Sequence, residues 1–430
     1  MNRWKQHSLI DVADVLLSNV DKKTKLNERM IRLCNYTDVY KNSFINIEKS
    51  RGFMIATCNE DEYQKFILRK GQVAITKDSE TAGDIGVPAY ISDDFQDVVL
   101  GYHLSLITPN KYKLSGIFLR YWLNTKQAKK YFENNTGGSG QRYSLSLNCI
   151  KSIPLLIPDL QTQESIGKVL HDLDIKIELN NRINAELEAM AKTIYDYWFV
   201  QFDFPDENGN PYKSSGGKMV YNKQLKRKIP EGWVAGHFGD YAKVKSGFAF
   251  KSTWWSDEGI PVLKIKDINE DYSLNQNDFS FVNEDKMIIA ERFLSRPGDV
   301  VIAMTGATIG KFALIPMTEK PILVNQRVGL YDLGNQLFEK VPFLINSMKQ
   351  EFFRSLVVSI AGGAAQPNIS GEQLDAFPMI FPSNDLISEY NNKFSLCYRL
   401  ISNNILQNQK LTQLRDWLLP MLMNGQVKVK

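Results

Sequence analysis

Apolar residues recur at alternating steps of four and three along two long stretches of the chain, and this spacing predicts two long amphipathic helices. The first stretch carries the seam positions Ile166, Leu170, Leu173, Ile177, Asn180, Asn184, Leu187, Ala191 and Ile194. The second carries Tyr390, Phe394, Cys397, Ile401, Asn404, Asn408, Leu411, Arg415 and Leu418, each 224 residues after its counterpart. The same pattern of seam positions therefore occurs twice in the sequence.

Two asparagines interrupt the seam at the same two steps in both stretches. We expect the two helices to pair as an antiparallel coiled coil in which buried asparagines fix the register. The alternative is that each asparagine is a solvated residue on a helix surface. The residues expected at the helix pairing are Ile177, Asn180, Asn184, Leu187, Ile401, Asn404, Asn408 and Leu411.

The rest of the chain also repeats, in a fixed order and at a shift that drifts from 229 to 224 residues. Trp4 corresponds to Trp233, the GGSGQ of 137–141 to the GGAAQ of 362–366, and the PLLIP of 154–158 to the PMIFP of 378–382. Each half begins with a region rich in short Val- and Ile-rich strand patterns and ends with one of the long helices. Strands are predicted at Gln72–Thr76, Val98–Ile107, Val300–Ala303 and Ile322–Leu330.

These patterns predict an α+β fold with two mixed α/β domains separated by two long helical regions, as a tandem repeat with pseudo-two-fold symmetry. Turn-forming Asn, Pro and Gly residues favour a linker between the halves. The expected regions are a first mixed domain at 1–158, a central helical region at 159–200, a linker at 201–229, a second mixed domain at 230–382 and a C-terminal helical region at 383–425.

The composition is that of an ordinary globular protein, with 43% hydrophobic and 23% charged residues. A net charge of +4 is compatible with nucleic-acid binding without requiring it. The four cysteines show neither C-x-x-C pairing nor zinc-ligand spacing, so we interpret them as buried reduced thiols. No stretch resembles a signal peptide or a membrane span, which favours a cytoplasmic protein without membrane contact.

Patterns that carry catalysis are weak in this sequence, and we expect no catalytic residue and no metal site. Residues 306–311 (GATIGK) resemble a phosphate-binding loop, but the glycine spacing is one residue short and Phe312 replaces the Ser or Thr that would bind magnesium. Asn210, Pro211 and Tyr212 resemble part of an amino-methyltransferase motif, but we interpret them as a turn. We interpret the basic run around Lys226 as solvated surface. We interpret the aromatic run at 248–255 as part of the core.

The paired Gly-rich loops at 136–142 and 362–368 are the best candidates for contact with a ligand, because glycine lets the backbone approach closely. Gln can bond adenine and Arg can bond guanine through two hydrogen bonds each. The alternative is that both are plain surface loops.

Several motifs resemble the specificity subunits of type I restriction–modification systems. SGFAFKS at 246–252, GIPVLKIKD at 259–267, TGATIGK at 305–311 and NQR at 325–327 resemble a target-recognition domain of that family. YWFVQFDFP at 197–205 is similar to the end of the central helical region, and LRDWLLPMLMNG at 414–425 to the C-terminal helix. The first half departs from the pattern, since SETAGDIG at 79–86 stands where the second half has its Gly-Lys loop.

The resemblance implies a non-catalytic, DNA-binding subunit that recognises a bipartite site in double-stranded DNA. Two modification subunits would hold S-adenosylmethionine and methylate adenine, and two restriction subunits, where present, would supply ATP- and Mg-dependent restriction for host defence. This chain would bind no cofactor of its own. The expected DNA-binding residues are Lys77, Ser79, Thr81, Gly138, Ser139, Gln141, Arg142, Thr305, Gly306, Thr308, Lys311, Gln326, Arg327, Gly363, Gln366 and Asn368.

Two alternatives remain open at this point. The chain could serve a modification-only or type II-like system, or it could be a DNA-binding regulator or adapter without an enzyme partner. Whichever alternative holds, each predicted long helix of about 30 residues would span about 45 Å. This is slightly more than one turn of B-DNA, about 34–36 Å, so antiparallel helices would hold two readers of a split site apart.

Overall fold

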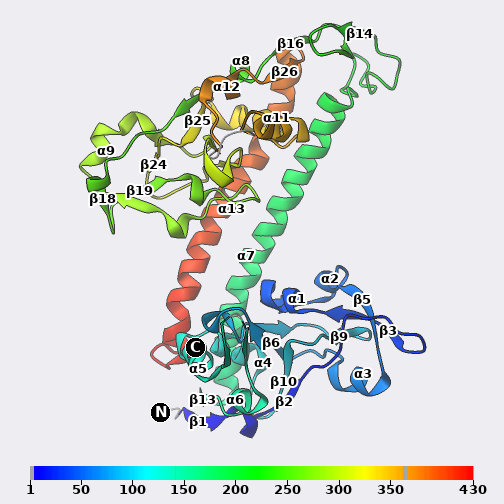
Figure 1. The fold of residues 1–430 in the computed structure, drawn as a ribbon, viewed down its shortest axis with the longest axis vertical. Helices are drawn as coiled ribbons and strands as arrows, with labels where there is room; N and C mark the ends of the chain where they lie inside the picture. Colours follow the sequence, from blue (N-terminus) through cyan, green and yellow to red (C-terminus); the bar gives the residue numbers. More distant parts are fainter. Residues whose placement is uncertain (1–3, 141, 362–366, 430) are drawn as a thin grey trace. The chain divides into compact units, whose positions relative to one another are not determined.

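A computed structural model describes residues 4–140, 142–361 and 367–429 of the chain (Figure 1). Contacts divide it into two compact units, each described here by itself. Unit 1 comprises Met1–Lys176 and Leu411–Lys430, and unit 2 comprises Ile177–Lys410. Each unit therefore contains one globular region and a segment of both long helices.

Unit 1 is built on a five-stranded sheet in the order β2-β10-β6-β8-β4. Its strands are β2 (Ala13–Leu17), β4 (Phe44–Ile45), β6 (Val73–Thr76), β8 (Pro88–Ile91) and β10 (Leu104–Pro109). All four residues of β6 are buried, because apolar side chains cover both faces of the sheet at this strand. The central strands are thus fixed by two hydrophobic clusters, one on each face.

Smaller sheets and short helices complete unit 1. The further strands are β1 (Lys5–Ser8), β3 (Arg29–Cys34), β5 (Met54–Cys58), β7 (Asp78–Ser79), β9 (Val98–Leu100), β11 (Gly137–Ser139), β12 (Arg142–Ser144) and β13 (Pro154–Ile157). The helices are α1 (Tyr36–Lys41), α2 (Ile47–Ser50), α3 (Glu60–Phe66), α4 (Gly116–Leu123), α5 (Lys126–Asn135) and α6 (Leu147–Lys151).

Unit 2 contains a four-stranded sheet in the order β17-β25-β22-β23 and a five-stranded sheet in the order β18-β20-β19-β24-β21. The strands of the first sheet are β17 (Lys243–Ser246), β22 (Val300–Ala303), β23 (Phe312–Leu314) and β25 (Val328–Asp332). Those of the second are β18 (Trp255–Ser256), β19 (Ile260–Leu263), β20 (Ser280–Val282), β21 (Leu294–Ser295) and β24 (Ile322–Val324).

Two strand pairs and a set of short helices complete the globular part of unit 2. The pairs are formed by β14 (Met219–Asn222) with β15 (Arg227–Pro230) and by β16 (Val234–His237) with β26 (Pro378–Phe381). The helices are α8 (Phe238–Tyr241), α9 (Lys286–Ile289), α10 (Val341–Met348), α11 (Glu351–Ala361) and α12 (Gly371–Asp375).

The predicted repeat is confirmed by matching strand order and register in the two units. The order β2-β10-β6 in unit 1 corresponds to β17-β25-β22 in unit 2, with all four pairings antiparallel. The first strand of each repeat pairs with the strand that precedes a long helix: Ser8 lies opposite Pro154, and His237 lies opposite Pro378. In each repeat, the first strand is therefore paired with the last strand before the long helix begins.

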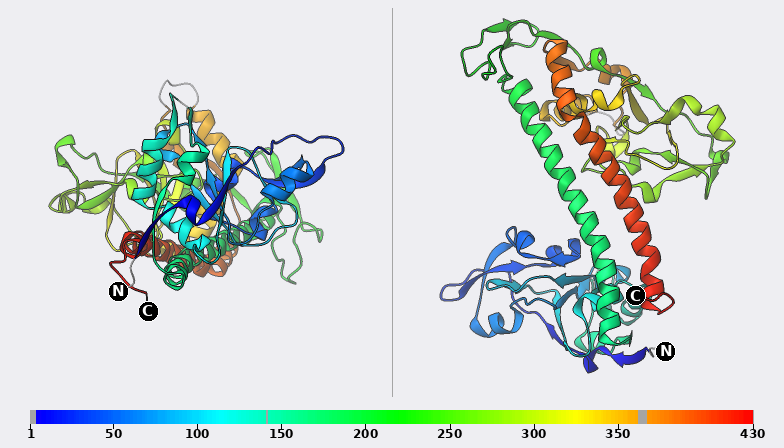
Figure 2. Two further views of the ribbon diagram at one scale, coloured as in Figure 1. Left: turned by 90° about the horizontal axis from the view of Figure 1, so that it is seen from below. Right: turned by 180° about the vertical axis from the view of Figure 1, so that it is seen from behind.

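The long helices are α7 (Leu160–Tyr195) and α13 (Asn384–Met423). Within unit 2 their segments lie side by side in both Figure 1 and Figure 2, joined by asparagine side chains. Asn404 Nδ2 donates to Asn184 Oδ1 at 2.8 Å, and Asn180 Nδ2 donates to Asn408 Oδ1 at 2.8 Å. Since one residue number rises as its partner's falls, the helices run antiparallel there, as predicted.

Ile401 is buried, and Leu187 packs against the main hydrophobic cluster of unit 2. Both therefore lie in the core that surrounds the asparagine pairs. That the asparagines fix the register stays a prediction.

Three sequence expectations differ from the structure. The strand predicted at 98–107 is divided into β9 and β10, and the strand predicted at 322–330 is divided into β24 and β25. The segment 201–229, expected to be a linker, contains β14 and most of β15, and an aromatic stack of Phe204 on Tyr212 orders its first part.

Among the described residues, none of the helices combines the length and the apolar character that a membrane span needs.

Candidate nucleic-acid interface

The same three backbone segments meet in each unit, and we call each meeting point a junction. In unit 1, the Lys77 N–H donates to the His103 carbonyl at 3.0 Å, and the Leu145 N–H donates to the Lys77 carbonyl at 2.7 Å. In unit 2, Met304 donates to Arg327 at 3.0 Å, and Ile369 donates to Met304 at 2.9 Å. These pairs correspond through the repeat, so the junction is part of the shared backbone plan.

The junction of unit 2 brings together four residues that the sequence predicts to contact DNA. Thr305, Gln326, Arg327 and Asn368 line one open cavity of about 410 Å³. Thr305 follows β22, Gln326 and Arg327 precede β25, and Asn368 precedes α12, so three separate segments supply them. Gln326 and Arg327 are exposed, and Arg327 forms no ion pair within the described residues.

The loop after β22 is held tightly by its glycines. Gly306 has φ +76°, and its N–H donates to the Pro367 carbonyl at 2.9 Å. Gly310 has φ +79°, and a Cβ there would lie 2.7 Å from Val357 Cγ1. The side-chain hydroxyls of Thr305 and Thr308 are buried, with no hydrogen-bond partner in the part of the chain that the structure describes. The loop thus contains two buried hydroxyl groups whose hydrogen bonding is unsatisfied among the described residues.

The backbone of this loop differs from that of a phosphate-binding loop, as its sequence also does. A 3-10 turn (Gly306–Thr308) is followed by strand β23, whereas a phosphate-binding loop leads into a helix. Lys311 does not line the cavity of unit 2 and forms an ion pair with Glu270 at 3.3 Å. Its predicted role in DNA contact would require that pair to open.

The junction of unit 1 is organised as a three-stranded sheet, β11-β12-β7. Ser79 lies opposite Tyr143, and β12 begins at the exposed Arg142. Gly138 has φ +110° in β11, and a Cβ there would lie 2.1 Å from the Arg142 carbonyl oxygen, so only glycine fits this hairpin. The predicted segments 77–81 and 137–142 are therefore neighbours in space.

Asp78 and His103 form a polar pair in this junction that sequence reasoning missed. His103 Nδ1 lies 2.5 Å from Asp78 Oδ2, and Lys77 Nζ lies 3.3 Å from the same oxygen. Burial raises the pKa of the Asp78 carboxyl, but hydrogen bonds from Ser144 and His103 and the charge of Lys77 outweigh it and hold that pKa below its ordinary value. Asp78 is thus an anion that orients two cationic or potentially cationic side chains.

The structure describes only some of the remaining residues that the sequence predicts to contact DNA. Thr81 donates its backbone N–H to Ser79 Oγ at 3.2 Å. The backbone of Ser139 lies in β11. Gln141, Gly363 and Gln366 lie outside the described residues.

The aromatic run in unit 2, which we interpret from the sequence as core, is only partly buried. Phe248, Phe250, Trp254 and Trp255 pack against a buried cluster, and Phe248 stacks on Trp254 with ring centroids 5.8 Å apart. These half-buried rings therefore cover the edge of a core cluster.

Comparison with known proteins gives one consistent result. The family model described as the type I restriction modification DNA specificity domain matches residues 1–189 and 230–409. The type I restriction enzyme HindI specificity subunit of Haemophilus influenzae is 24% identical, with 99% of this chain and 100% of the relative aligned. The MjaIX specificity subunit of Methanocaldococcus jannaschii is also 24% identical, over 73% of this chain and 69% of the relative.

A solved structure shares the fold. The crystal structure of a type I restriction–modification S subunit from M. genitalium aligns with a TM-score of 0.59 at 14% identity, over 98% of this chain and 96% of the other. The two family matches coincide with the two repeats found in the sequence. Each match includes one globular region and most of the long helix that follows it.

Proposed function

Because this chain belongs to the family of type I restriction–modification DNA specificity subunits, we propose that its two junctions each recognise one half of a bipartite DNA target. The observation that carries this proposal is the shared junction geometry with unlike side chains. His103 in unit 1 and Arg327 in unit 2 occupy corresponding positions on one backbone plan. Two such surfaces would present different sets of donors and acceptors to base edges.

The polar groups at the junctions fit contact with duplex DNA. Arg327 and Arg142 are exposed and without an ion pair among the described residues, so either can bond a phosphate or the edge of a guanine. We assign neither junction a catalytic role, because the matching family and its relatives are specificity subunits. The chemistry would then belong to partners: two modification subunits that hold S-adenosylmethionine and methylate adenine, and restriction subunits that use ATP and Mg.

The direct test is a methylation map of DNA from cells that express this chain with its neighbouring modification subunit. We expect a split motif with a methylated adenine in each half and a fixed spacer. The cells that lack this chain should show none of it. Absence of any new methylation, with both proteins made, would favour the regulator or adapter instead.

Single-junction variants make the test specific. Arg327→Ala should relax or weaken recognition of one half-site by about 1–3 kcal/mol, and Arg142→Ala should affect the other half-site. Arg292→Ala and Arg51→Ala are matched controls, since these exposed arginines lie in the same units away from the junctions. Equal loss at both half-sites from either junction variant would contradict two independent readers.

Adding the restriction subunit distinguishes the remaining systems. DNA cleavage that depends on ATP and on an unmethylated target would support a full type I complex. Methylation without any cleavage would favour a modification-only system with the same specificity mechanism.

A further inference from the structure

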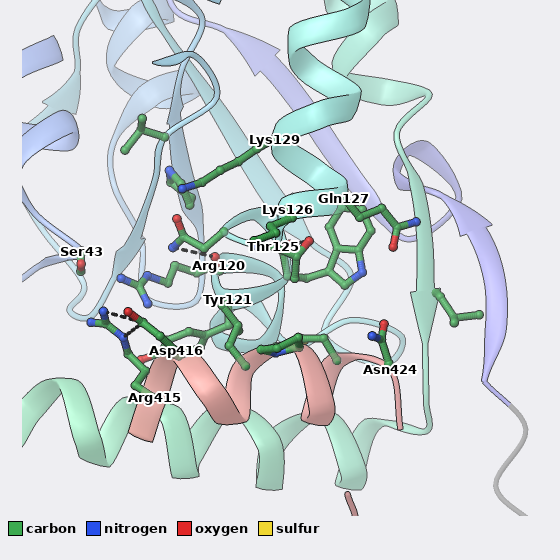
Figure 3. A pocket seen from close by; sticks show the side chains of 18 of the residues that line it. Ser43, Arg120, Tyr121, Thr125, Lys126, Gln127, Lys129, Arg415, Asp416 and Asn424 are labelled. Atoms are coloured by element: carbon green, nitrogen blue, oxygen red, sulfur yellow. Dashed lines mark hydrogen bonds and ion pairs between the residues drawn. The ribbon is translucent and has the colours of Figure 1, made fainter. Parts of the chain in front are cut away.

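Unit 1 contains a large cavity that the proposed DNA recognition does not use. It measures about 770 Å³, which lies in the range of small-molecule sites, and it is lined by α4, the start of α5 and the end of α13 (Figure 3). The described residues of both junction segments, 77–81, 137–140 and 142, are absent from its lining. The cavity is therefore separate from the candidate DNA-contact residues of this unit.

The lining is strongly cationic. Lys41, Lys126 and Lys129 are exposed, and none of them forms an ion pair within the described ranges. Arg120 and Arg415 also line the cavity and share the buried carboxylate of Asp174, at 3.0 Å and 2.7 Å. Arg415 also forms an ion pair with Asp416, another lining residue, at 2.8 Å. Two carboxylates therefore balance the two guanidinium groups, and the excess of positive charge comes from the three lysines.

Arg120 lacks part of its hydrogen bonding in the structure. Its side chain is only 5% exposed, Nη1 donates to Asp174, and Nε is buried with no partner in the described part of the chain. Burial lowers the pKa of the guanidinium, against the opposing charge of Asp174, but arginine stays protonated. A buried unsatisfied donor beside a cavity is the position at which an anionic acceptor would bind most favourably.

The amino end of helix α5 opens on the same cavity. Its ten residues begin after Thr125, whose hydroxyl accepts from the Ala128 N–H at 3.2 Å. The N–H groups of Lys126 and Gln127 have no acceptor within the helix, because the first turn lacks preceding carbonyls. The positive end of the helix dipole adds to the charge of the lysines and favours an anion there.

The repeat shows that the fold does not require these charges. Helices α4 and α5 correspond to α10 and α11 at a shift of 225 residues, where Ile345 replaces Arg120 and Glu351 replaces Lys126. At the 224-residue shift of the long helices, Ala191 stands in the position of Arg415. At the same shift, Arg354 keeps a cation at the position of Lys129. Unit 2 nevertheless folds on the same plan without cationic counterparts of Arg120, Lys126 and Arg415, so the fold does not require these three charges.

We propose that this cavity of unit 1 binds a phosphate group, held by Arg120, Lys126, Lys129 and the amino end of α5. Guanidinium, ammonium and helix N–H groups together match the several acceptor oxygens of a phosphate. The phosphate can belong to a free polyphosphate or to a nucleic-acid backbone, since both carry the same recognised group.

The test uses the purified full chain and inorganic pyrophosphate as the probe in isothermal titration calorimetry at low chloride. Saturable binding is expected for the wild type. Lys126→Gln with Lys129→Gln should weaken it by about tenfold or more, because charge-assisted hydrogen bonds are lost. Both lysines are exposed, so the double variant should unfold at the same temperature as the wild type without ligand. Lys22→Gln with Lys23→Gln is the matched control and should bind normally.

A second titration, in the presence of saturating duplex DNA without terminal phosphates, identifies the source of the phosphate. Competition would assign the cavity to a backbone phosphate, and independent binding would assign it to a free phosphate ligand. Either result supports the phosphate site. No saturable binding by the wild type, or equal affinity in the Lys126/Lys129 double variant, would overturn it.

Discussion

The buried amide pair of Asn184 and Asn404 offers a quantitative test of how the long helices are held together in unit 2. The side chains are 9% and 8% exposed, and Asn404 Nδ2 donates to Asn184 Oδ1 at 2.8 Å. Asn184→Leu removes the acceptor and leaves the Asn404 amide buried without it. Leaving one such group unsatisfied costs about 1–3 kcal/mol, and we expect about 2 kcal/mol for either single variant.

The double variant Asn184→Leu with Asn404→Leu should recover most of that loss. Replacing both partners with apolar groups of similar volume leaves no buried polar atom of this pair, and the change in unfolding free energy should stay within about 1 kcal/mol of the wild type. With about 2 kcal/mol lost in each single variant, the coupling between the two positions is then about 3 kcal/mol or more, at the upper end of the range of about 0.5–3 kcal/mol that contacting residues show.

Urea unfolding of the full chain and of the variants, followed by far-UV circular dichroism, measures the effect. Asn403→Leu is the matched control, because Asn403 is exposed on the same helix, and it should change stability little. Single variants as stable as the wild type, or a double variant that loses the sum of the single losses, would refute the pairing argument.

Three further predictions follow from buried groups elsewhere. Asp174→Leu leaves its two arginine partners without their shared buried carboxylate and should destabilise unit 1 by about 3–5 kcal/mol in denaturant unfolding; a loss below about 1 kcal/mol would contradict the geometry. Burial raises the pKa of Asp267 to about 6, so folded unit 2 holds this proton more tightly than the unfolded chain. Stability from this group is present at low pH and falls as pH rises from about 4 to about 6. Asp267→Asn should remove that fall, which melting temperatures across the range can check. Gly310→Ala should lower stability by about 1–3 kcal/mol, because of φ +79° and a Cβ contact of 2.7 Å with Val357, and calorimetry would show it; an unchanged melting temperature would contradict the strain.

The repeat and the helix seam could be predicted from sequence because they rest on periodicity. A 224-residue shift preserved nine seam positions, including both asparagines, and a buried polar residue at matching steps is hard to explain without pairing. Short Val- and Ile-rich runs predicted the central strands β6 and β22, whose residues are all buried.

The junctions could be predicted only in part, because a short apolar run does not show where a strand bends. The runs at 98–107 and 322–330 read as continuous strands, yet each contains a break that carries His103 or Arg327 into a junction. His103 adopts φ +69°, a conformation that nothing in its neighbours signals. Histidine is among the non-glycine residues in which a positive φ is enriched, but the sequence does not show which histidine adopts it.

In each unit, a hydrogen bond joins the globular region to a long helix. The side chains that form it differ between the two repeats, although the backbone arrangement is the same. Tyr121 on α4 donates to Asp174 at 2.7 Å, and the corresponding residues Asn346 and Tyr398 form a hydrogen bond of 3.0 Å, with the donor again on the short helix. One join is ionic and the other neutral, so this backbone arrangement tolerates either chemistry. Side chains at the junctions are less constrained still, since Arg142 and Arg327 are exposed. If the two junctions are the readers that we propose, a fold that fixes their backbone and leaves their side chains to vary independently suits a target whose two halves differ in sequence.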